Sequence, residues 1–151
     1  IQLAAKSDQE WKVKWFVGDL ARLPLLDQSM DLLLDIFSPA NYQEFKRVLS
    51  PDGRLIKVIP TAAHLQEIRQ KVKDHLDQAD YSNEQIIQHF SDHFTIENTI
   101  HCQETFELTP ALREALLSMT PLLFHVDPTQ IDWTDLTQVT ISATILIGRS
   151  N

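Results

Sequence analysis

The chain is short of the residues that build several common kinds of site. Its single cysteine, Cys102, excludes an internal disulfide and any cysteine cluster for zinc. Its three glycines are far apart, so there is no glycine-rich loop. No apolar run approaches the roughly 20 residues that cross a membrane, and no signal peptide is visible. These absences predict a cytoplasmic protein without a membrane partner.

The charge is one-sided as well. The 151 residues include 13 lysines and arginines against 21 aspartates and glutamates, which gives a net charge of −8. Proteins that bind RNA through its phosphates need clustered positive charge, so this balance argues against RNA binding by this chain alone. The length is that of one globular domain with a sizeable core.

The middle of the chain predicts a strand, a helix and a second strand. Residues 30–37 are almost continuously apolar, which is typical of a strand covered on both faces. Ser38 as N-cap and Pro39 at the first helical position predict a helix over 40–49. Turn residues end that helix, and residues 55–59 predict a second buried strand.

This arrangement predicts where a ligand would bind. Two parallel strands joined by a helix form a right-handed unit, so Phe37, Ser38 and Pro60 should lie at the same carboxyl edge of the sheet. In open α/β sheets, ligands bind at that edge.

Periodicity and capping signals predict the remaining elements. They are helices over 1–6, 65–79, 82–90, 109–119 and 127–136 and strands over 11–17, 94–108 and 139–148. The helix over 109–119 should place on the core Leu112, Ala115, Leu116 and Met119. The last two strands should form an antiparallel hairpin, which makes the fold α/β with a mostly parallel sheet.

Several short motifs carry a family resemblance. Residues 19–24 (DLARLP), 29–31 (SMD) and 49–55 (LSPDGRL) are similar to the middle of class I S-adenosylmethionine-dependent methyltransferases. Residues 36–39 (IFSP), 60–65 (PTAAHL) and 116–121 (LLSMTP) resemble, in this order, the large-subunit (23S) ribosomal RNA (guanine-N1)-methyltransferases. The match runs over residues 1–150.

The resemblance implies a partial Rossmann-like sheet and, for the full-length protein, methyl transfer to guanine N1 of ribosomal RNA. The family's glycine-rich loop, its ribose-binding acid and its zinc module have no counterpart here, so we expect a fragment without zinc. Residues 1–151 should then form one partial domain, with 1–27 at the far side of the sheet and 28–151 its central to C-terminal part. An open strand edge in such a fragment predicts a homodimer or a strand-swapped assembly.

The resemblance also implies cofactor contacts. It places His64 against S-adenosylmethionine, and it gives Asp19, at a strand end, a hydrogen bond from the adenine amine. Leu20 and Phe37 belong to the same predicted cofactor site. On its residues alone, Asp19 caps the following turn, and a histidine at the start of a helix is a surface or capping residue.

Four further residues are candidates for the substrate side. Asp35 could accept the guanine N1 proton, because a carboxylate near a strand end is costly unless it faces a cleft or finds donors. The alternative is that Asp35 accepts hydrogen bonds from a loop amide. Ser38, Pro39 and Phe124 are predicted to contact the substrate, with Phe37 or Phe124 stacking on the base.

An alternative function and a possible metal site also have to be considered. The chain could be a non-catalytic binding or dimerisation module that keeps the methyltransferase fold, which the charge and the missing glycine-rich loop favour. His89 and His93 have a spacing that can chelate zinc, but no third ligand is suitably spaced, so the sequence predicts no metal site.

Overall fold

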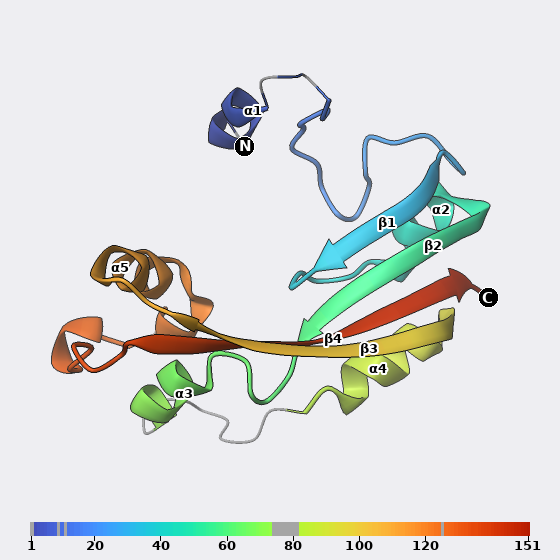
Figure 1. Ribbon diagram of the computed structural model, residues 1–151. Coiled ribbons are helices and arrows are strands. Elements are labelled where there is room, and N and C mark those ends of the chain that lie inside the picture. The colour runs from blue at the N-terminus through green and yellow to red at the C-terminus, as the bar shows by residue number, and fades with distance from the viewer. Residues whose placement is uncertain (1, 9, 11, 74–81, 125) are drawn as a thin grey trace.

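The computed structural model describes residues 2–8, 10, 12–73, 82–124 and 126–151. It contains a mixed sheet with the strand order β1-β2-β4-β3 (Figure 1). The strands are β1 (Met30–Ile36), β2 (Leu49–Pro60), β3 (Phe94–Glu107) and β4 (Gln138–Ser150). β1 and β2 are parallel, whereas β4 is antiparallel to both β2 and β3. The predicted α/β fold with an antiparallel C-terminal hairpin is confirmed, but the sheet of the described residues is mixed rather than mostly parallel, because β4 is antiparallel to both of its neighbours.

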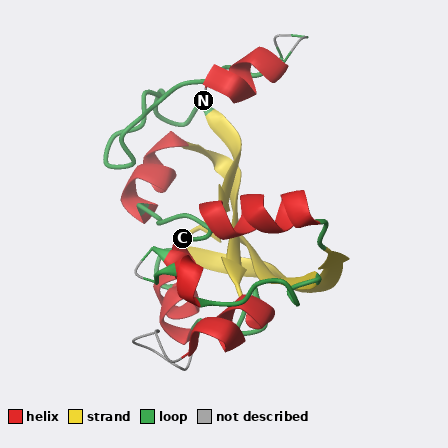
Figure 2. Cartoon of the chain, turned by 90° about the vertical axis from the view of Figure 1, so that its left-hand side faces the viewer, coloured by secondary structure: helices red, strands yellow, loops and turns green. Residues whose placement is uncertain are grey.

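The chain also has helices, which lie beside the sheet except for the N-terminal one, which lies apart from it (Figure 1 and Figure 2). They are α1 (Gln2–Ser7), α2 (Tyr42–Val48), α3 (Gln66–Val72), α4 (Glu84–Ser91) and α5 (Pro110–Met119), with the short 3-10 helices η2 (Pro121–Leu123) and η3 (Pro128–Gln130). Two groups of buried side chains join helices to strands. The first core is formed by Tyr42, Phe45, Leu49, Leu55, Ile59, Phe90, Phe94 and Leu146. The second core is formed by Leu65, Ile68, Val72, Leu123, Val126, Leu136 and Val139.

The first strand differs from its prediction in burial. β1 forms where expected, but Leu32, Leu34 and Ile36 are 51–58% exposed on one face. The expectation of cover on both faces is therefore wrong, because burial requires a second layer that an apolar run cannot reveal. β1 is an edge strand in the described part of the chain, since it pairs only with β2.

The start of α2 is also corrected. The helix begins at Tyr42, and its N-cap is Asn41, whose side-chain oxygen accepts a hydrogen bond from the Glu44 N–H at 3.2 Å. Ser38 does not cap it, because its hydroxyl donates to Asp35 instead. A buried acceptor close to Ser38 thus competes successfully with the helix end.

The predicted strand over 11–17 is not formed in the described residues 12–17, which belong to no helix or strand. Trp15, Phe16 and Val17 are 45%, 48% and 83% exposed. Alternation of apolar residues indicates strand propensity, but a strand forms only where a neighbouring edge accepts its backbone hydrogen bonds.

The C-terminal half follows the prediction with three changes. Thr109 caps α5 as expected, yet Leu112 and Met119 on the predicted core face are 56% and 70% exposed. The predicted helix over 127–136 is reduced to η3. The helix predicted from residue 65 begins at Gln66, and its last part, residues 74–79, lies outside the described residues.

Candidate functional site at the carboxyl edge of the sheet

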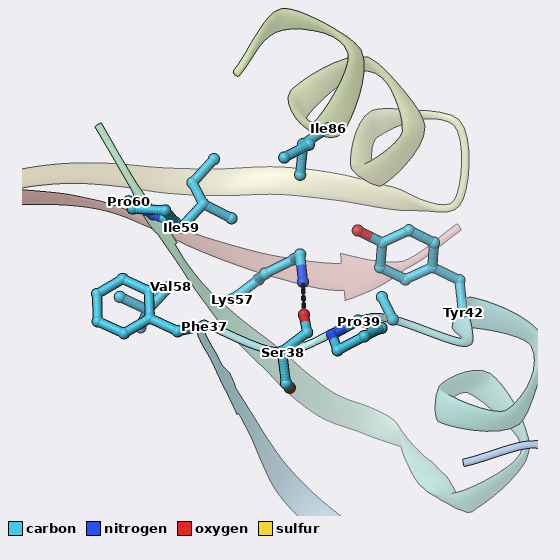
Figure 3. A pocket seen from close by; sticks show the side chains of 10 residues that line it. Phe37, Ser38, Pro39, Tyr42, Lys57, Val58, Ile59, Pro60 and Ile86 are labelled. Carbon is cyan, nitrogen blue, oxygen red and sulfur yellow. Dashed lines mark hydrogen bonds between the residues drawn. The ribbon is translucent and has the colours of Figure 1, made fainter. Parts of the chain in front are cut away.

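The ends of β1 and β2 meet as predicted. The Phe37 N–H donates to the Val58 carbonyl at 3.0 Å, which extends the parallel pairing one residue past β1. A cavity of about 350 Å³ opens beside this edge (Figure 3). It is lined by Phe37, Ser38, Pro39, Ala40, Tyr42, Lys57, Val58, Ile59, Pro60 and Ile86.

Phe37 and His64 lie together at this edge. Their ring centroids are 5.0 Å apart with an interplanar angle of 43°. Phe37 has a positive φ of 51°, which is unfavourable for a bulky residue and is maintained only where surrounding contacts fix it. Phe37 and His64, which the resemblance assigns to one cofactor site, are therefore neighbours, and their part in binding stays a prediction.

The edge of β4 beyond the end of β2 holds His64 in place. β2 ends at Pro60, opposite Ala143, so β4 continues beyond it with backbone groups that β2 does not pair. The Ser142 N–H donates to His64 Nδ1 at 3.3 Å, and the next such group, the Thr140 N–H, donates to Glu67 at 2.9 Å. The turn before α3 and the first turn of α3 therefore complete the hydrogen bonding of the β4 edge.

The same contacts set the charge of His64. Because Nδ1 accepts from a backbone N–H, the ring proton lies on Nε2. Burial, followed by the positive charge of Arg69, holds the pKa of His64 below its ordinary value of 6.5. His64 is thus an uncharged ring at neutral pH, with Nε2–H as a hydrogen-bond donor.

Asp35 takes part in a buried ion pair. Its carboxylate lies 2.6 Å from Lys57 Nζ, and the two residues are 3% and 4% exposed. Lys57 Nζ also donates to the Ser38 carbonyl at 3.1 Å, and the Ser38 hydroxyl donates to the second carboxylate oxygen of Asp35. Asp35 has found donors, although they are side chains rather than the loop amide of the alternative interpretation.

Tyr42 forms the inner wall of the cavity. Burial, followed by the negative charge of Asp35, raises the pKa of the Tyr42 hydroxyl to about 12. The ring of His93 stacks on Tyr42 at 5.1 Å, and that of His89 meets it edge-on at 4.9 Å. In the part of the chain that the structure describes, no three His, Cys, Asp or Glu side chains are grouped to hold a metal ion.

Five predicted site residues lie outside the cavity lining. Two of them, Asp35 and His64, contact the lining residues Lys57 and Phe37, whereas Asp19, Leu20 and Phe124 have other surroundings. The Asp19 carboxylate accepts from the Ala21 N–H at 2.9 Å, which is the turn-capping alternative. Leu20 packs against the first core, and Phe124 is 70% exposed. The cofactor and substrate roles of these residues stay predictions.

Sequence reasoning missed Lys57 and Tyr42. A signal for Lys57 was present, since a lysine in the apolar run 55–59 needs a buried partner, and Asp35 occupies the matching place in the preceding strand. Tyr42 gave no signal, because it reads as an ordinary core position of a helix.

Comparison with known proteins finds relatives of this chain. No family model matches the chain. It is 34% identical over 137 residues to a putative 23S rRNA (guanine-N(1)-)-methyltransferase of Bacillus subtilis, which covers 89% of this chain and 49% of the relative. It is 26% identical over 137 residues to the 23S rRNA (guanine(748)-N(1))-methyltransferase of Streptomyces fradiae, covering 84% and 47%. By sequence, the chain is a homologue of proteins named 23S rRNA (guanine-N1)-methyltransferases. It spans about half the length of these curated relatives.

Solved structures support the fold of this methyltransferase-family chain. A putative methyltransferase from Bacillus halodurans matches with a TM-score of 0.56 at 13% identity, covering 98% of this chain and 76% of that one. A SAM-dependent methyltransferase from Thermotoga maritima matches with a TM-score of 0.52 at 17% identity, covering 97% and 69%. At these identities the likeness shows the fold alone. No described helix is long and apolar enough to span a membrane.

The edge of the sheet fits one side of a site for S-adenosylmethionine. Phe37 offers an aromatic face, and the cavity beside it is lined mainly by apolar side chains. His64 is uncharged and Lys57 is paired with Asp35, so neither residue would repel a sulfonium ion. These residues would hold only part of the cofactor, because the predicted contacts Asp19 and Leu20 lie outside the cavity lining.

Proposed function

We propose that this chain contributes the carboxyl-edge half of an S-adenosylmethionine-dependent methyltransferase that methylates guanine N1 of large-subunit ribosomal RNA. The observation that supports it most directly is the contact between Phe37 and His64 beside the cavity, at the end of two parallel strands. Both residues belong to the motifs that resemble this family.

In this proposal the chain's residues align the reacting groups. S-adenosylmethionine supplies an electrophilic methyl group, and the transfer depends mainly on alignment with the nucleophile. Uncharged His64 and the ring of Phe37 would bind the cofactor side. Ser38 and Pro39 would contact a guanine that has left its stack, and the exposed ring of Phe124 could support that base.

A proton must also leave guanine N1. Asp35 is the predicted acceptor, and its buried ion pair with Lys57 gives it a competing structural role. If Asp35 is the base, Asp35→Asn abolishes turnover in the complete enzyme while the fold is kept. Unchanged turnover would remove Asp35 as the base.

The proposal requires partners beyond this chain. Its net charge of −8 opposes RNA binding, so we expect most RNA contacts to come from other parts of a complete enzyme. For the chain alone, we propose self-association through β1, whose outer edge is unpaired in the described residues and whose apolar face is half exposed.

Complementation tests the activity. The chain is mixed with the section of the Bacillus subtilis relative that it does not match, together with tritiated S-adenosylmethionine and a 23S RNA transcript. We expect methyl incorporation, located as a reverse-transcription stop because N1-methylguanine cannot pair normally. Since stacking on an aromatic ring contributes about 1–3 kcal/mol per base, Phe37→Ala should lower the rate by about tenfold or more.

A lysine far from the cavity provides the matched control. Lys71 pairs with Asp135 at 2.5 Å, and Lys71→Met should leave incorporation unchanged. If the two sections associate but transfer no methyl group, the chain is a binding module, which is the alternative function. Equal activity of the Phe37→Ala and wild-type mixtures would contradict the proposed site.

A further inference from the structure

Lys57 has no role in the function proposed so far, although it lies where the two strands meet the cavity. Its Cα is paired in register with that of Asp35, and its alkyl stem lines the cavity (Figure 3). The ammonium group reaches two acceptors, the Asp35 carboxylate at 2.6 Å and the Ser38 carbonyl at 3.1 Å. One buried cation therefore joins the end of β1 to the loop that follows it.

That loop has an unfavourable conformation. Phe37, between the two residues that Lys57 holds, has a φ of 51° without being glycine. Such a conformation persists only when neighbouring contacts determine it. Three contacts are present: the Phe37 N–H bond to Val58, the Lys57 bond to the Ser38 carbonyl, and the Ser38 hydroxyl bond to Asp35.

Stability alone is a poor explanation for this ion pair. Burying two charges costs desolvation energy, and apolar side chains of similar volume often stabilise a protein as well or better. A buried pair at the rim of a site is more useful for geometry, because a bond to a backbone carbonyl fixes the direction in which the chain leaves the strand.

We propose that Lys57 is a positioning residue: through the Ser38 carbonyl and Asp35, it holds the 37–39 loop so that the Phe37 ring faces His64. In this role Asp35 is the counter-ion of Lys57 and acts through the loop, which is separate from the proton acceptance proposed for it above. The purpose of the loop geometry rests on the proposed function, whereas the geometry itself can be tested without any ligand.

The test uses three variants of the full chain. Lys57→Met removes the charge and keeps the stem, but it leaves the buried Asp35 carboxylate without its cation. The double variant Lys57→Met with Asp35→Asn removes both charges, and the amide oxygen that replaces the carboxylate can still accept from the Ser38 hydroxyl. Lys71→Met is the matched control, because it removes a lysine from a different ion pair.

Two quantities are measured for each variant. One is the nuclear Overhauser effect between the Phe37 and His64 ring protons, and the other is the urea concentration at the midpoint of unfolding. We expect Lys57→Met to lower the midpoint and to remove the ring contact. The double variant should recover much of the midpoint but not the ring contact, because the bond to the Ser38 carbonyl is still missing. Lys71→Met should keep the contact.

One result would overturn the proposal. It is a folded double variant in which the Phe37–His64 effect is as strong as in the wild type, which would make Lys57 merely structural.

Calorimetry with S-adenosylmethionine separates this proposal from the function. We expect the chain alone to bind weakly, so the complemented mixture is titrated, and misplacing the loop should weaken its affinity by about tenfold to a hundredfold. If the wild-type mixture does not bind while the ring contact still depends on Lys57, the proposed function fails and the positioning role stands. If binding depends on Phe37 but neither binding nor the ring contact depends on Lys57, the positioning role fails and the proposed function stands.

Discussion

His64 combines two tasks that substitution can separate. Its Nδ1 accepts the Ser142 N–H and completes the β4 edge, while its ring contacts Phe37 at the cavity. Alanine removes both interactions. Asparagine keeps an oxygen close to the place of Nδ1, so it should retain the bond to Ser142 and lose only the ring.

The structure sets the size of each effect. An unpaired N–H costs about 1–3 kcal/mol, and since the 3.3 Å bond is long we expect the low end, about 1 kcal/mol. The ring pair should contribute about 0.5–1.5 kcal/mol. His64→Ala should therefore lower the free energy of unfolding by about 2 kcal/mol, and His64→Asn by about 1 kcal/mol.

Urea unfolding followed by circular dichroism measures the stability, and calorimetry with S-adenosylmethionine on the complemented mixture measures binding. His64→Asn should be about 1 kcal/mol more stable than His64→Ala and yet bind no better, because binding depends on the ring. Equal stabilities of the two variants would refute the edge-capping role of His64. Wild-type binding by His64→Asn would refute its cofactor role.

The pH dependence of stability provides a second check on His64. The unfolded imidazole takes up a proton near pH 6.5, whereas the folded one does so only at lower pH. Between these values the unfolded state binds more protons, so stability is complete above pH 6.5 and falls on acidification. The difference from His64→Asn should have a slope of at most about 1.4 kcal/mol per pH unit, less because the ring is only half-buried.

Three further predictions concern the cavity wall, the first core and the sheet edge. Asp35→Asn should lower the Tyr42 pKa from about 12 but keep it above 10, because burial is the larger cause of the shift. Absorbance titration of the two tyrosines measures this pKa, and an unchanged titration would contradict the influence of Asp35. A Cβ at Gly148 would lie 2.7 Å from the buried Phe90 ring. Gly148→Ala should therefore lower the free energy of unfolding in urea by about 1–3 kcal/mol. Adding Phe90→Leu should relieve this loss, and no loss in Gly148→Ala alone would mean that the ring shifts freely. Leu34→Lys should convert a wild-type dimer into a monomer in light scattering, and a wild type that is already monomeric would refute association through β1.

The sequence predicted the elements of the sheet better than their surroundings. β3, β4 and α5 begin within a residue or two of their predicted starts, because alternation, Thr109 and Pro110 are local signals. Predictions failed where the outcome depends on hydrogen-bond partners that the local pattern does not show. Ser38 lost its capping role to Asp35, and residues 12–17 found no strand edge in the described part of the chain.

The candidate site divides in the same way. The place of Phe37 and Ser38 at the strand ends followed from the βαβ pattern, since parallel strands meet at one edge. The exact partners did not. The contact of Phe37 with His64 depends on β2 ending before β4 does, which leaves the Ser142 N–H to hold the imidazole.

By itself, the sequence determined the order of β1 to β4 along the chain, the carboxyl edge at which the motifs meet and the family that they resemble. These follow from local periodicity, turn residues and short motifs. Only the tertiary structure decided that Lys57 neutralises Asp35, that His64 is uncharged and that one face of β1 is open. Each depends on residues far apart in sequence, whose desolvation and hydrogen bonding exist only once the sheet has formed.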